Sequence, residues 1–104
     1  MAYNKLVRDN IPAMIKQEGK GPVTRLLNDK ECVAELKKKL IEESLEVSSA
    51  DEKHIKEELA DVWEVFTAII KVSHLSLDEV KDAAVNKRME RGGFDQKIFL
   101  TDVK

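Results

Sequence analysis

The sequence predicts an all-α protein, with about four helices in a bundle built on an antiparallel helical hairpin. Two long segments, residues 28–49 and 55–69, carry apolar side chains at the spacing of one helix face. Residues 48–51 (SSAD) interrupt this pattern. We therefore expect two long helices joined by a short turn, with their apolar faces packed together.

The first helix is expected soon after the N-terminus. Asp9 or Asn10 can cap it, and Pro12 stands in its first turn, where a proline is well tolerated. Gly19 and Gly21 follow and end this helix.

Two later helices begin with a capping box, in which a polar cap residue is followed three positions later by Glu. Asn28 and Glu31 start the second helix, and Ser76 and Glu79 start the fourth. The glycine pair at residues 92–93 ends the fourth helix.

Two short segments have β-like composition. Residues 22–27 (PVTRLL) follow a Gly-Pro break, and residues 97–101 (KIFLT) follow the last helix. The second segment has the length and composition to pair with the first, so we expect that the two can pair and tie the ends of the fold together.

At 104 residues the chain predicts a single domain, residues 1–104. Only 5% of the residues are aromatic, and a domain of this size leaves about a third of its unfolded surface exposed. A lone monomer would have a thin core, so we expect a homo-oligomer.

The composition disfavours nucleic-acid-binding, disulfide-linked and membrane proteins. Charged residues make up 37% of the chain, yet the net charge is only -2, which disfavours a nucleic-acid polymer as the main ligand. The chain has one cysteine, and it lacks a signal segment and an apolar run long enough for a membrane span. We expect a cytoplasmic protein without an internal disulfide.

Four carboxylates stand close to the apolar stripes of the predicted hairpin. Glu43 falls on the stripe of the second helix, with Glu46 beside it, and Glu58 and Asp61 lie along one side of the third. Acids that converge at a helix interface repel one another unless cations or protons neutralise them. All-oxygen ligands suit Mg²⁺, or Mn²⁺, and Mg²⁺ commonly bridges carboxylates to phosphates.

One other interpretation of these acids stays open, and a second is disfavoured by the sequence. The glutamates can form a solvated face, since residues 37–39 are lysines at helical spacing from them. A di-iron bundle would require Glu-x-x-His pairs, and neither His54 nor His74 has a Glu three positions earlier.

Five basic residues can bind phosphate oxygens. Lys5 and Arg8 stand near the N-terminus, and Lys87, Arg88 and Arg91 stand near the end of the fourth helix. The helix dipole alone also favours cations in the last turn, so the second group has a structural explanation as well.

The acidic segments KLIEESLE and EELADVWEV resemble the signature of the all-α nucleotide pyrophosphohydrolases, the MazG and phosphoribosyl-ATP pyrophosphohydrolase superfamily. The opening YNKLVRDNIP and the ending KRMERGGF resemble a branch of small MazG-like proteins, so the likeness extends to nearly the whole chain. The resemblance implies an α-helical bundle whose active sites are completed in homodimers or homotetramers.

By position, the resemblance implies that Glu43, Glu46, Glu58 and Asp61 hold Mg²⁺, that Glu43 is catalytic, and that Glu42 has a water-activating or outer role. The five basic residues named above would bind the phosphates of a nucleotide. Asn10 stands where this branch would have a Lys.

We expect Mg²⁺-dependent hydrolysis of a nucleoside triphosphate to a monophosphate and pyrophosphate, as in the cleansing of nucleotide pools. Two alternatives stand beside it. One is the phosphoribosyl-ATP pyrophosphohydrolase of histidine synthesis, and the other is a non-catalytic helical interaction module.

Overall fold

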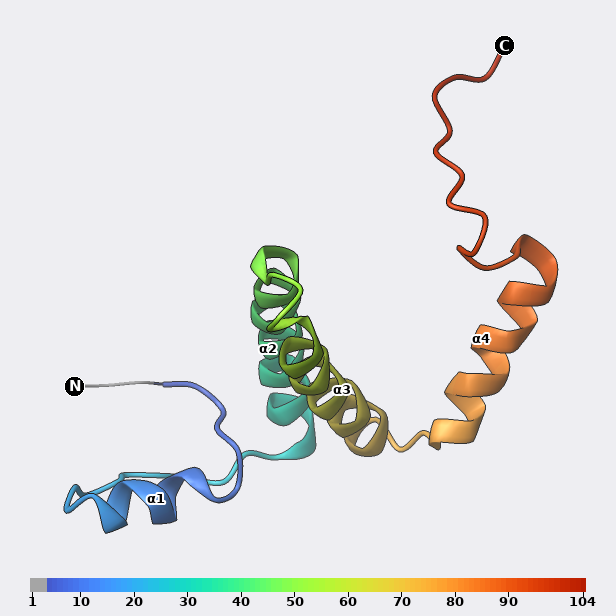
Figure 1. Ribbon diagram of the computed structural model, residues 1–104. Helices are drawn as coiled ribbons and strands as arrows, with labels where there is room; N and C mark the ends of the chain where they lie inside the picture. Colours follow the sequence, from blue (N-terminus) through green and yellow to red (C-terminus); the bar gives the residue numbers. More distant parts are fainter. Residues whose placement is uncertain (1–3) are drawn as a thin grey trace.

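The computed structural model describes residues 4–104, and this part of the chain is entirely helical apart from turns and loops. It contains α1 (Ile11–Gln17), α2 (Asp29–Ser49), α3 (Ile55–Val72) and α4 (Leu77–Arg91) (Figure 1). The predicted all-α class with four helices is therefore confirmed.

The two β-like segments do not form the predicted strands. Over residues 4–104 there is no strand, and residues 22–27 and 97–101 have no regular secondary structure. Their apolar side chains are exposed, with Val23 at 99% and Phe99 at 87%. A two-stranded pair is marginal in water unless it packs on a core, and neither segment has one beneath it here.

The helix ends follow their capping signals. Asn28 and Ser76 cap α2 and α4 with complete capping boxes, in which each side chain accepts a hydrogen bond from the backbone N–H three residues later. These bonds are 2.8 Å long at Glu31 and 3.1 Å at Glu79. In α1, by contrast, Asn10 occupies the N-cap position without a side-chain hydrogen bond.

The core lies between α2 and α3, which pack along each other and are joined by a turn at residues 50–54 (Figure 1). Leu36 of α2 and Val65 and Ile70 of α3 are the buried apolar side chains among the residues described. This small core agrees with the thin monomer core that the composition predicts.

The four helices do not close into one bundle within this chain. α4 contacts α3 through few residues and projects away from the α2–α3 pair, while α1 lies on the other side (Figure 1). The radius of gyration is 18.1 Å, against about 13 Å for a compact chain of this length. The predicted four-helix bundle is thus limited to α2 and α3, because α1 and α4 have no buried side chains to hold them.

In residues 4–104, none of the helices combines the length and the apolar character needed to cross a membrane.

Candidate metal centre

Three carboxylates from the facing helices meet beside the core. α2 supplies Glu43, and α3 supplies Glu58 and Asp61, which share a helix face because they are three residues apart. Each offers one oxygen, and these oxygens all lie within 4.8 Å of one another. All three residues are half-buried. We call this group the acidic triad.

Glu43 is the member most affected by its surroundings. Burial raises the pKa of its carboxyl, and the charges of Asp61 and then of Glu58 and Glu42 raise it further, while Lys39 lowers it. The carboxyl of Glu43 therefore gives up its proton less readily than an ordinary glutamate. A cation placed among the three oxygens would remove that cost.

A cavity of about 850 Å³ opens beside the acidic triad. The chain before α1, with residues of α1 itself, forms one wall, and α2 and α3 form the other. We call residues 4–10 the N-terminal segment. Three cations, Lys5, Arg8 and Lys39, line this cavity together with Glu43 and Asp61. Much of the remaining lining is apolar: Leu6, Val7, Ile11, Met14, Leu36, Val65 and Ala68.

Arg8 joins the N-terminal segment to the triad. Its Nη2 donates a hydrogen bond of 2.8 Å to Oδ1 of Asp61. The side chains keep 58% and 43% of their surface exposed, so the ion pair is accessible to water. The structure therefore places this predicted phosphate-binding residue directly on a predicted metal ligand.

Two of the predicted acids lie outside the triad. Glu46 follows Glu43 by three residues on α2, but it is exposed and does not belong to the triad. Glu42 is also exposed and forms an ion pair with Lys39, with 3.9 Å between Oε2 and Nζ. The structure thus brings together three of the four predicted ligands.

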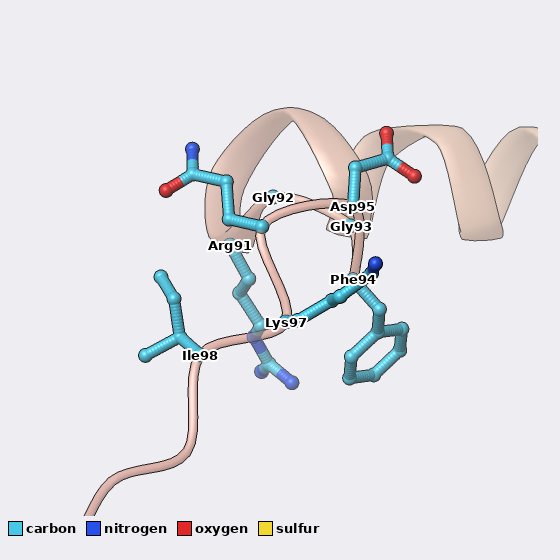
Figure 2. Close-up of a pocket in the computed structure, with 8 residues that line it drawn as sticks. Arg91, Gly92, Gly93, Phe94, Asp95, Lys97 and Ile98 are labelled. Carbon is cyan, nitrogen blue, oxygen red and sulfur yellow. The ribbon is translucent and has the colours of Figure 1, made fainter.

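The basic residues of α4 do not reach the cavity of the same chain. Lys87, Arg88 and Arg91 are exposed, and none of them lines it. Arg91 instead lines a separate hollow of about 370 Å³, formed by the consecutive residues 91–98 at the end of α4 (Figure 2). That hollow is a local feature of one loop and includes no residue of the triad.

Two charged residues of the cavity wall were not predicted from the sequence. The helical spacing predicts Lys39 among the lysines of a solvated face, and it predicts Glu64 on the surface because Glu64 projects away from the apolar stripe. Both line the cavity. Their spacing gave the available signal, since Lys39 precedes Glu43 by four residues and Glu64 follows Asp61 by three.

Comparison with known proteins identifies the family. The MazG nucleotide pyrophosphohydrolase domain matches residues 32–93, which is more than half of the chain and includes the whole acidic triad. The class is that of the nucleotide pyrophosphohydrolases, and this chain belongs to the MazG family. The resemblance inferred from the two acidic segments is therefore confirmed.

A relative among curated proteins matches part of the chain. It is an uncharacterized protein of Mycolicibacterium smegmatis, 49% identical over 47 residues, which are 45% of this chain and 48% of the relative. The chain thus spans about half the length of that relative. No solved structure matches this chain.

Proposed function

We propose that this protein hydrolyses a nucleoside triphosphate to a monophosphate and pyrophosphate, with Mg²⁺ held by the acidic triad and Mn²⁺ as a substitute. The observation that carries the proposal is the position of the triad at the edge of a cavity that also presents Lys5, Arg8 and Lys39. A magnesium–phosphate complex is positive at the metal and negative at the phosphates. The carboxylates of this cavity suit the metal, and its cations suit the phosphates.

The donor set fits a small hard cation. All the ligand atoms are carboxylate oxygens, and they lie within 4.8 Å of one another, so that small side-chain rotations would let them hold one cation. The ion, when bound, would lower the pKa of an attacking water and offset the charge of the phosphates. Glu46 would join only through an outer position, because it stands outside the triad.

The protein's own side chains would divide the remaining work. Glu43 is the proposed catalytic carboxylate at the triad, and Glu42 is a weaker candidate for accepting the proton of the attacking water. Lys5 and Arg8 would bind phosphate oxygens from the N-terminal wall, where their charges can stabilise the negative charge that develops during cleavage. The apolar part of the cavity would cover the base and exclude water from it.

We further propose that the cavity is completed by a second copy of the chain, in a homodimer or homotetramer. Lys87, Arg88 and Arg91 stand on a helix that projects away from its own hairpin (Figure 1). Apolar side chains of α4 and the C-terminal residues are also exposed, including Met89 at 81% and Phe94 at 96%. A partner that covers these side chains would place the three cations over the cavity of the other copy.

The test is pyrophosphate release from a panel of canonical, deoxy and modified nucleoside triphosphates and phosphoribosyl-ATP, with Mg²⁺. Glu58→Gln should abolish the reaction, whereas Glu57→Gln, at the adjacent exposed position, should retain it. If the purified protein released no pyrophosphate from any member of the panel, the proposal would be wrong. Cleavage of phosphoribosyl-ATP alone would instead assign the histidine-synthesis reaction.

A non-catalytic interaction module is the second candidate, because the exposed apolar surface suits a binding partner. Such a module has no need of a selective metal site. A Mg²⁺-dependent rise in melting temperature that Glu43→Gln removes would therefore favour the enzyme over the module.

A further inference from the structure

The ion pair between Arg8 and Asp61 connects two parts of the chain that have little else in common. Among residues 4–104, it is the one side-chain hydrogen bond between positions more than six apart. The N-terminal segment has no regular secondary structure, and its backbone forms no hydrogen bond with α2 or α3. Arg8 is therefore its principal polar attachment to the hairpin.

The same contact neutralises part of the acidic triad. Asp61 uses one carboxylate oxygen, Oδ1, to accept from Arg8, and Glu58 forms no ion pair within the part of the chain described. Lys39 is the other nearby cation, and it contacts Glu42 rather than a member of the triad. Without a metal ion, the guanidinium of Arg8 is thus the cation in direct contact with the triad.

We propose that Arg8 is an exchangeable counter-ion, which holds Asp61 in the metal-free protein and leaves it when a divalent cation is bound by the acidic triad. The inference rests on the proposed metal centre. The physical reason is that a guanidinium and a divalent cation on one carboxylate repel each other, and water can solvate Arg8 because the pair is exposed.

The exchange couples metal binding to the N-terminal segment. Once Arg8 has left Asp61, its side chain remains on the cavity wall and is free to bind phosphate. A triad without metal would keep this residue occupied. Arg8 would then be available to phosphate only after the metal has entered, which gives an order of binding: the divalent cation first and the phosphates on Arg8 second.

The test measures Mg²⁺ affinity by calorimetry, without nucleotide, in the parent protein and two charge-matched variants. Arg8→Gln removes the competing cation, and we expect it to bind Mg²⁺ about two- to fivefold more tightly, as the strength of an exposed ion pair suggests. Lys5→Gln removes one positive charge from the same segment and cavity without touching Asp61. It should therefore change the affinity less than Arg8→Gln does.

A second measurement follows Arg8 itself by nuclear magnetic resonance of its Nε–H group, assigned through its loss in Arg8→Lys. The resonance in metal-free Asp61→Asn gives the position of the unpaired side chain. Addition of Mg²⁺ to the parent should move the Arg8 resonance towards that position. In Glu43→Gln, which weakens the metal centre but retains Asp61, the same Mg²⁺ concentration should move it less.

The results separate the inference from the proposed function. Mg²⁺ binding by the parent with equal affinity in Arg8→Gln and Lys5→Gln, or with an unmoved Arg8 resonance, would overturn the exchange and leave the metal centre intact. A parent and an Arg8→Gln variant that both fail to bind Mg²⁺ or Mn²⁺ would overturn the metal centre and the exchange together.

Discussion

Glu43 on α2 and Asp61 on α3 present carboxylate oxygens within 4.8 Å of each other across the helix pair. After burial, the charge of Asp61 is the largest cause that raises the pKa of Glu43. Two acids this close together at the edge of so small a core lower the stability of the metal-free folded state, and a cation bound between them would offset that cost.

The first prediction concerns pH. The pKa of Glu43 is higher in the folded protein than the about 4.3 of an unfolded chain, so between the two values the folded state binds more protons. Stability conferred by this proton is therefore lost as pH rises through the folded pKa. Glu43→Gln should unfold at higher urea concentration than the parent at pH 7 in the presence of a chelator.

The difference between Glu43→Gln and the parent should disappear near pH about 3, where the carboxyl is protonated in both states. Glu57→Gln, which changes an exposed glutamate of α3, should leave the urea midpoint almost unchanged at either pH. A Glu43→Gln variant that is less stable than the parent at pH 7 would contradict the argument.

The second prediction concerns metal binding and stability. Mg²⁺ at about ten times its Kd should stabilise the parent by about 1.4 kcal/mol, a rise in Tm on the order of 5–10 °C for a chain of this size. Glu58→Gln and Asp61→Asn should lose this rise. Glu46→Gln should retain most of it, because Glu46 lies outside the acidic triad. Equal losses in Glu46→Gln would place a fourth ligand at that position.

The third prediction concerns the capping box of α2. Asn28→Ala removes the 2.8 Å hydrogen bond to the backbone of Glu31 and should cost about 1 kcal/mol of unfolding free energy. Since Asn28 is remote from the acidic triad, the Kd for Mg²⁺ of the folded protein should not change. Urea unfolding and calorimetry measure the two effects separately, and Asn28→Ser, which keeps a capping oxygen, is the control.

The fourth prediction concerns the sharing of sites between copies. If α4 of one copy completes the cavity of another, then Glu58→Gln in one chain and Arg88→Ala with Arg91→Ala in another damage different halves of each site. In a symmetric dimer, equal co-expression of the two inactive chains should restore about a quarter of the parent activity. Mixtures that stay inactive would mean that no intact site is assembled between copies.

Much of the secondary structure could be predicted from the sequence, because it depends on neighbours along the chain. The capping boxes at Asn28 and Ser76 fix where α2 and α4 begin, and both use residues only three positions apart. The β-like segments were predicted wrongly for the opposite reason. A strand requires a distant partner and a core to cover, and composition alone supplies neither.

The candidate site divides in the same way. Helical spacing in the sequence determined that Glu43, Glu58 and Asp61 lie along the inner sides of two helices, and this spacing with the family motif led to a metal centre. Only the tertiary structure decided that Glu46 turns outward, that Arg8 reaches Asp61 and that α4 departs from the hairpin. Those outcomes depend on how α2 is oriented against α3, on a loop and on contacts across the chain, none of which a local pattern of residues encodes.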